Sequence, residues 1–256
     1  MRGNRSSLFK DAAGFLPVLA FLALWEAVAR LGIFPPSLLP PFSHVVRETF
    51  ILIRSGVLPH HFLKSLYRVL IGFTTGSVAG LLCGLGMGWK DGLQRTFSPI
   101  VSFLYPIPAL GWLPIFMIWI GVNELLPIAI IFTCSFFPVL YNTASGVRSV
   151  DKNYVQVART LGQGEGTILF TVLLPLALPS IFTGLRLEAG MAWRVIIAAE
   201  MVAIPTGIGA LLMRAESLIR MDIIIVCLIV LAVMCFSFER FFYLLEKKLT
   251  GRWLLG

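Results

Sequence analysis

Residues 154–175, YVQVARTLGQGEGTILFTVLLP, form the longest polar interruption in the C-terminal half of a very apolar chain. Asp151 is placed to cap a helix at the start of this stretch, and Gly162 is placed to end it. Apolar residues recur at helical spacing and would share one face: Tyr154, Val157, Ala158 and Leu161. We therefore predict a short amphipathic helix whose apolar face covers either the protein's own bundle or a groove of a partner protein.

A second short helix is predicted after the first. Gly164 and Gly166 allow a turn, and residues 167–174 form an apolar segment long enough for a helix of two turns. Pro175 and Pro179 are expected to redirect the chain into the next apolar segment.

The chain as a whole is too apolar for a soluble domain. Of its 256 residues, 57% are hydrophobic and 13% are charged, whereas soluble domains have about 25% charged residues. A membrane-spanning helix needs about 20 apolar residues. Six blocks have roughly that length, at residues 14–31, 65–88, 100–120, 125–147, 181–203 and 223–245. We expect an all-α integral membrane protein with six transmembrane helices.

The formal net charge of +8 does not indicate nucleic-acid binding, because the basic residues lie mainly between the apolar blocks and form no stripe interleaved with aromatics. With the N-terminus in the cytoplasm, the cytoplasmic segments hold twelve Lys and Arg residues and the outer segments hold seven. The positive-inside rule therefore favours cytoplasmic N- and C-termini. This orientation also places residues 154–175 in the cytoplasm.

Residues 1–64 are predicted to form an N-terminal part with a cytoplasmic tail, the first span and an external amphipathic helix over residues 42–55. Residues 65–256 are predicted to form a five-span core with a cytoplasmic loop at 150–178. The first span could be a cleaved signal peptide, since residues 27–29 have the small-x-small form of a cleavage site. Trp25 and the Glu26 to Arg30 pair are more typical of the interfacial end of a retained helix.

No metal site is predicted. His44, His60 and His61 show no carboxylate or cysteine at ligand spacing, so they are expected to be solvated in a loop. All cysteines lie inside apolar blocks without metal-ligand spacing, which indicates small apolar residues.

The second span has a glycine at every fourth position over five positions: Gly72, Gly76, Gly80, Gly84 and Gly88. Such a stripe lets another helix approach closely where lipid supplies no hydrophobic drive for association. The alternative is the ordinary tolerance of glycine in membrane helices. Five glycines in register favour close packing.

The third span is crowded with prolines and aromatics. Prolines at this density break a helix and free backbone carbonyls, which is tolerated at membrane depth only against protein or a water-filled cavity. A bent packing helix is the alternative. The candidate pathway residues in this span are Tyr105, Pro106, Pro108, Trp112 and Trp119.

The fifth span carries four charged residues, each of which would cost about 2.5–3.5 kcal/mol at mid-membrane on an isolated helix. None has an opposite charge three or four residues away, so their partners must come from other helices or from a solute. Arg194 either lines a pathway and favours an anion, or pairs with a carboxylate on a facing helix. Glu200 is expected to be structural, with Arg68 as a possible partner. The candidate pathway residues here are Glu188, Trp193 and Arg194.

The polar stretch resembles the cytoplasmic signature of ABC importer permeases, in particular the sulfonate, taurine, nitrate and bicarbonate group. That signature reads E-A-A, three residues, G, nine residues, I-x-L-P. The matching positions are Gln156-Val157-Ala158, Gly162 and Val172-Leu173-Leu174-Pro175. The likeness extends to residues 65–68, 177–190 and 192–201 and to the basic tail ending in Arg252-Trp253.

The resemblance implies a type I importer permease in the inner (plasma) membrane, with a five-helix core and an added N-terminal span. Its partners would be a second permease copy, two ATPase subunits that bind ATP and Mg, an extracytoplasmic solute-binding protein and membrane lipid. The subunit itself would hold no cofactor and catalyse no reaction, since no GxxxxGK[ST] phosphate loop occurs in the chain.

The solute implied by the resemblance is small and anionic. Residues implied to contact the ATPase are Tyr154, Gln156, Val157, Ala158, Arg159, Leu161, Gly162 and Pro175. Gln156 stands where the family usually has glutamate, so apolar burial is expected to dominate this contact.

Two other classes of protein are less consistent with the sequence. A self-powered secondary transporter should show internal repeats and ion-binding groups in broken helices, and no convincing repeat is present. A membrane-embedded enzyme would need clustered nucleophiles or acid–base residues in the spans, whereas the histidines all lie in the first outer loop.

Overall fold

The protein is helical and without strands over the residues that the structure describes. The computed structural model describes the helices of residues 5–250 and the side chains of residues 16–249. The tail ending in Arg252-Trp253 lies outside the described residues. In chain order the α-helices are α1 (Arg5–Arg30), α2 (Phe42–Arg54), α3 (Val57–Trp89), α4 (Asp91–Leu104), α5 (Leu113–Trp119), α6 (Leu125–Arg148), α7 (Lys152–Thr160), α8 (Glu165–Ile168), α9 (Leu174–Ala203), α10 (Ile208–Ser217) and α11 (Met221–Thr250).

The chain divides into two compact units. One contains residues 1–60 and 211–229, and the other contains residues 61–210 and 230–256. The sequence predicted a different boundary, at residue 64, between an N-terminal part and the five-span core. That boundary stays a prediction. In the first unit, the C-terminal end of α1 is tied to the start of α2, because Trp25 Nε1 donates to the Pro40 carbonyl at 3.1 Å and the Ser43 N–H donates to Glu26 at 3.0 Å.

Four helical segments in the described part of the chain are long and apolar enough to cross a membrane: Val57–Trp89, Leu125–Arg148, Glu165–Ala203 and Met221–Leu249. A fifth span is possible if the bent pair Asp91–Leu104 and Ala109–Trp119 counts as one. The predicted first span, residues 14–31, coincides with α1 up to Arg30, and α1 is not among these segments. The multi-pass membrane class is therefore supported, and the exact number of six spans stays a prediction.

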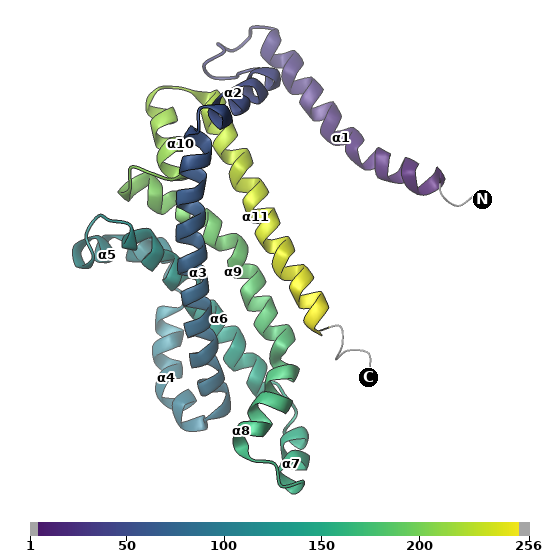
Figure 1. Ribbon diagram of the computed structural model, residues 1–256, viewed down its shortest axis with the longest axis vertical. Helices are drawn as coiled ribbons and strands as arrows, with labels where there is room; N and C mark the ends of the chain where they lie inside the picture. The colour runs from purple at the N-terminus through teal and green to yellow at the C-terminus, as the bar shows by residue number, and fades with distance from the viewer. Residues whose placement is uncertain (1–4, 251–256) are drawn as a thin grey trace. The chain divides into compact units, whose positions relative to one another are not determined.

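The third predicted span is broken, as its prolines indicated. α4 ends at Leu104, and the chain resumes with a 3₁₀ turn (Ala109–Trp112) and α5. The two halves are bent by 88° relative to each other, and Figure 1 shows α5 turned away from the direction of α4. The break coincides with Pro106 and Pro108, which cannot donate the backbone hydrogen bonds that a continuous helix requires.

The prediction that Pro175 and Pro179 redirect the chain is wrong. α8 leads through a π-helical turn (Leu169–Leu173) directly into α9, so residues 165–203 form one helical segment. Pro175 lies in the first turn of α9, where its missing N–H costs least. The wider π turn immediately before it gives the proline ring room against the preceding carbonyls.

α6 packs closely against both α3 and α9 because glycines on the contact faces remove the side chains in between. A Cβ on Gly76 or Gly80 of α3 would lie 2.5 Å from the carbonyl oxygen of Phe132 or Phe136 on α6. On the other side of α6, a Cβ on Gly184 of α9 would lie 2.9 Å from the Cβ of Asn142. The backbones of these helices thus approach more closely than any larger residue permits.

Candidate functional site

The polar stretch that follows α6 folds into the short helix α7. The Asp151 side chain accepts a hydrogen bond from the Asn153 N–H at 2.9 Å and caps the helix. Gly162 ends it with φ +77°, a conformation that favours glycine. Both the cap and the stop are as predicted. In Figure 1, α7 and α8 lie together at the lower end of the drawing.

α7 presents three exposed apolar side chains on one side. Tyr154, Val157 and Leu161 have 57%, 60% and 74% of their surface exposed. Ala158, which was expected on the same face, is only 8% exposed and packs into a cluster of the protein's own core. At 100° per residue, position 158 points away from the centre of the exposed face and toward the bundle. We call Tyr154, Val157 and Leu161 the α7 surface.

The inner side of α7 is anchored by this cluster. Ala158 belongs to it together with Leu85 of α3, Val147 of α6, Ile168 of α8 and Leu173 of the π turn. Because four other elements contribute to the cluster, the side of α7 that carries Ala158 is fixed against the rest of the unit. The inner side of α7 is thus fixed to the long helices, while its outer side is exposed.

Polar residues of α7 lie beside the exposed face. Gln156 and Arg159 line a cavity of about 280 Å³ together with Trp89 and Arg148. Arg159 also forms an ion pair with Glu165 at 3.0 Å. Glu165 was not among the predicted residues of this segment, although it follows Arg159 by six residues across a turn that contains Gly162 and Gly164.

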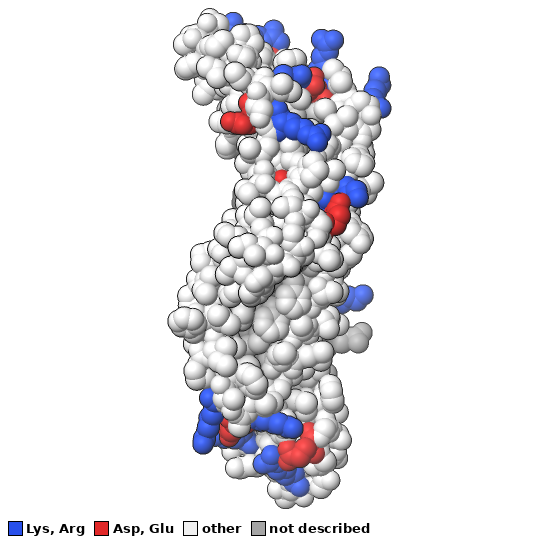
Figure 2. All heavy atoms as spheres, turned by 90° about the vertical axis from the view of Figure 1, so that its left-hand side faces the viewer, with Lys and Arg blue, Asp and Glu red and all other residues white. Residues whose placement is uncertain are grey.

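Charged groups gather at the end of the second unit that carries α7. Figure 2 shows basic and acidic side chains together at the lower end, and above them a broad surface that is mostly uncharged, with basic atoms at its right edge. The ion pairs here include Arg148 with Asp91 at 3.0 Å, in addition to Arg159 with Glu165. An uncharged band bordered by charges is the pattern expected of a membrane-embedded surface and its rim.

The break between α4 and α5 borders a cavity of about 410 Å³. We call it the Glu188 cavity. Tyr105, Pro106 and Pro108 line it from the broken span, Cys134 lines it from α6, and Glu188 lines it from α9. The structure thus brings together four of the predicted pathway residues. Trp112, Trp119, Trp193 and Arg194 do not line this cavity.

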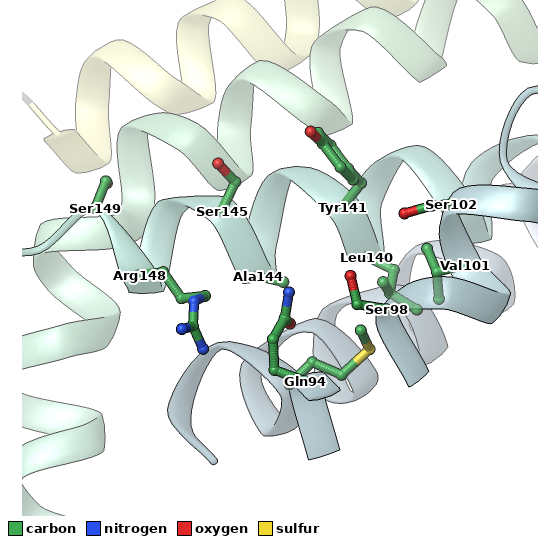
Figure 3. A pocket seen from close by; sticks show the side chains of 11 residues that line it. Gln94, Ser98, Val101, Ser102, Leu140, Tyr141, Ala144, Ser145, Arg148 and Ser149 are labelled. Atoms are coloured by element: carbon green, nitrogen blue, oxygen red, sulfur yellow. The ribbon is translucent and has the colours of Figure 1, made fainter. Parts of the chain in front are cut away.

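A second cavity, of about 390 Å³, lies between α4 and α6, and five of its eleven lining residues carry a hydroxyl group. We call it the serine cavity. Figure 3 shows its residues, which include Gln94, Ser98 and Ser102 from α4 and Tyr141, Ser145, Arg148 and Ser149 from α6. The Gln94 Oε1 atom is buried without a hydrogen-bond partner among the described residues. The sequence reading missed these residues, although polar groups recur every fourth residue on both helices.

Two stacked tyrosines link the cavities. Tyr105, which lines the Glu188 cavity, stacks on Tyr141, which lines the serine cavity, with ring centroids 5.4 Å apart and planes 5° apart. A solute that passed from one cavity to the other would meet this pair.

Among the described residues, three of the four charged residues of α9 have an oppositely charged partner on another element, and Glu188 is the exception. Glu200 bonds Arg68 at 2.7 Å, which confirms the predicted partner. Arg186 pairs with Glu246 at 3.5 Å and Arg194 pairs with Glu239 at 3.9 Å, both on α11. The alternative of a structural ion pair for Arg194 therefore has a specific partner, and a pathway role for Arg194 stays a prediction.

The three tryptophans named as pathway candidates lie elsewhere. Trp193 is 1% exposed and packs edge to face on Phe238, with ring centroids 6.2 Å apart. Its face of α9 therefore turns toward the packed interior of the described chain, and a pathway role for Trp193 stays a prediction. Trp112 stacks on Phe116 at 6.1 Å, and Trp119 is exposed.

The histidines differ from the expectation of a solvated loop. His61 is buried, and its Nδ1 accepts a hydrogen bond from the Gly207 N–H at 3.0 Å.

His44 lies one turn from Glu48 on α2. His44, Glu48 and Asp222 each offer a possible metal-ligand atom, and the three atoms lie within 4.8 Å of one another. The statement that no carboxylate accompanies His44 was therefore wrong. Arg220 bonds both carboxylates, at 2.8 and 2.7 Å, and offsets part of their negative charge.

Comparisons with known proteins agree with this architecture. Residues 76–251 match the binding-protein-dependent transport system inner membrane components. A putative ABC transporter permease protein of Methanocaldococcus jannaschii is 36% identical over 238 residues, which cover 91% of this chain and 88% of that protein. The taurine transport system permease protein TauC of Escherichia coli is 31% identical over 93% of this chain and 87% of its own length. The bicarbonate transport system permease protein CmpB of Synechocystis is 34% identical over 72% of this chain and 69% of its own length.

Solved structures share the helical arrangement. A crystal structure of an amino acid ABC transporter with histidines superimposes with a TM-score of 0.58 at 20% identity, covering 81% of this chain and 98% of that one. An inward-facing structure of the MetNI methionine ABC transporter gives a TM-score of 0.58 at 16% identity, covering 77% and 97%. At these identities the structures bear on the fold alone.

Proposed function

This chain belongs to the inner-membrane components of binding-protein-dependent transport systems, and on that premise we propose that it lines the solute pathway of an ATP-driven importer and is moved by a separate ATPase that contacts α7. The observation that carries the proposal is the α7 surface. Three large apolar side chains are exposed on a helix whose other side is packed into the core. Exposed apolar side chains on a rigid, otherwise polar segment are typical of a protein–protein contact.

The coupling follows from how α7 is held. A partner that binds the α7 surface and moves on ATP binding would push on a helix anchored to α3, α6 and the π turn before α9. ATP and Mg would be bound by that ATPase and not by this chain. The excess of basic residues in the segments assigned to the cytoplasm supports cytoplasmic termini and a cytoplasmic α7.

The pathway runs in this proposal through the Glu188 cavity, past Tyr105 and Tyr141, to the serine cavity. Hydroxyl groups and the Arg148 guanidinium of the serine cavity are hydrogen-bond donors suited to an oxyanion. This fits a small anionic solute, because the relatives named above include a taurine and a bicarbonate permease. A second copy of the chain would complete the pathway, two ATPases would drive it, and an extracytoplasmic binding protein would deliver the solute.

A charge on the α7 surface should uncouple transport without unfolding the protein. In Leu161→Glu, we expect ATP-dependent uptake by the complete importer to fall about tenfold or more, because burying a new carboxylate in the contact costs as much as losing a hot-spot residue. Since Leu161 is 74% exposed, the unfolding free energy should change by no more than about 0.5 kcal/mol. Uptake, ATPase co-purification and thermal unfolding in detergent measure the three effects.

Gln156→Ala is the matched control, since Gln156 is exposed on the same helix outside the α7 surface. We expect its uptake to stay within about fivefold of the wild type, as for most residues that surround a hot spot. Ala158→Glu is unsuitable as a test, because the carboxylate would enter the core cluster and destabilise the fold. Undiminished uptake and ATPase retention in Leu161→Glu would refute the proposed contact.

A further inference from the structure

The Glu188 cavity has one charged residue among those that line it, and that residue is negative. Glu188 is 8% exposed. One of its carboxylate oxygens accepts a hydrogen bond from the Cys134 thiol, with Oε2 and Sγ 3.3 Å apart. No basic group lies within ion-pair distance of Glu188 among the described residues. This carboxylate therefore faces the cavity without a countercharge from the protein.

The other charged residues of α9 are different. Arg186, Arg194 and Glu200 each have an oppositely charged partner on another element. A carboxylate kept away from water is stable as an anion only when a cation or several donors accompany it. A thiol is a weak donor and cannot replace such a partner. Glu188 is thus the one charge of this helix for which a cation from outside the chain would supply the missing partner.

The lining of the cavity indicates the kind of cation. Pro106, Pro108 and Met191 contribute apolar surface, and the Tyr105 and Phe137 rings also line it. Aromatic faces attract organic ammonium groups. Apolar walls suit an alkyl chain, whereas an inorganic cation would require several oxygen ligands. A volume of about 410 Å³ has room for a small organic molecule.

We propose that Glu188 binds the ammonium group of the transported solute, so that the pathway is selective for amine-bearing molecules. This inference rests on the proposed function and narrows it. An acidic group of the solute would interact with the donors of the serine cavity, and an amino group with Glu188. The solute class is then a zwitterion that carries both an acidic group and a primary amine, and not a simple anion.

The test compares probes that differ in one group. The full-length protein in detergent is treated with a hydrophobic carbodiimide, which modifies carboxyl groups in apolar surroundings, and modification of the Glu188 peptide is followed by mass spectrometry. Trimethyltaurine and ethyltrimethylammonium keep the cationic group but cannot attack an activated carboxyl group, as a primary amine would. They should slow this modification about tenfold, as for a cation held beside aromatic rings. Ethanesulfonate, which lacks the cationic group, should leave it unchanged. Equal protection by ethanesulfonate, or no protection by the two cations, would overturn the proposal.

A variant pair tests the same point in the assembled importer. Glu188→Gln should lower the uptake of taurine relative to ethanesulfonate about tenfold, while Glu216→Gln, at an exposed carboxylate of α10, should leave the ratio unchanged. An unchanged ratio in Glu188→Gln would contradict the proposal. It would mean that Glu188 carries no charge during transport, because an amide can replace a neutral carboxyl group without loss of taurine uptake. If wild-type protein takes up no solute with ATP, the proposed function fails, while the labelling result on the purified chain still decides the ammonium site.

Discussion

Replacing Arg68 with alanine should lower the unfolding free energy by about 3–5 kcal/mol, the cost of leaving a buried charge without its partner. Arg68 and Glu200 are both completely buried and lie 2.7 Å apart. Arg68 also donates to Glu124 at 2.7 Å and to the Thr206 carbonyl at 2.7 Å. Its removal therefore leaves the buried Glu200 carboxylate without its cation and the partly buried Thr206 carbonyl without this donor. Thermal unfolding of the purified protein in detergent measures the loss.

Lys64→Ala is the matched control, because Lys64 also pairs with Glu124 but does so at the surface, at 3.5 Å. It should cost less than about 1 kcal/mol of unfolding free energy.

A second readout is the titration of Glu124. The hydrogen bond from Arg68 lowers the pKa of Glu124, so this pKa should rise toward its usual value in Arg68→Ala. The double variant Arg68→Met, Glu200→Gln should regain part of the lost stability, since it leaves no charge stranded. Equal unfolding temperatures for Arg68→Ala and Lys64→Ala would contradict the structural role.

Substitution of Gly76 by leucine should prevent the close packing of α3 on α6. A Cβ at this position would already lie 2.5 Å from the Phe132 carbonyl oxygen and 3.0 Å from its Cα. Both atoms belong to the backbone of α6 and cannot move aside as a side chain would. Overpacking of this kind costs about 1–3 kcal/mol for small insertions, and Gly76→Leu should exceed the effect of Gly76→Ala.

Gly86→Ala is the control on the same helix, because a Cβ there meets only Leu93 Cδ1 at 3.5 Å, an ordinary contact. Its unfolding temperature should match that of the wild type. Size-exclusion profiles and thermal unfolding in detergent distinguish the two glycines. If Gly76→Leu and Gly86→Ala were equally stable, the stripe would not set the distance between α3 and α6.

Local features of the fold were predictable because their causes are local. Asp151 caps α7 and Gly162 ends it through backbone groups within a few residues. Pro106 and Pro108 break the third span because of their own missing N–H groups. The partner of Glu200 was also foreseeable, since a buried carboxylate needs a cation and Arg68 is the basic residue near the outer start of the second span.

Features that depend on which face of a helix meets which neighbour were not predictable. Ala158 was predicted to lie on the exposed apolar face of α7, yet it packs inward, because the cluster of Leu85, Val147 and Ile168 covers its side of the helix. Trp193 was placed on the pathway for its position beside Arg194, but consecutive residues of a helix point about 100° apart, and Trp193 packs on Phe238.

The sequence by itself determined the class of protein, because membrane spans, caps and breaks follow from hydropathy and from the chemistry of single residues. Only the tertiary structure decided which polar groups share a cavity. Glu188 and Cys134 lie 54 positions apart, and Ser98 and Ser145 lie on different helices. For Glu188 and Cys134, the close approach of α9 to α6 at Gly184 brings the two helices together. The physical reason is that helix contacts depend on steric fit between distant segments, which no local pattern in the chain records.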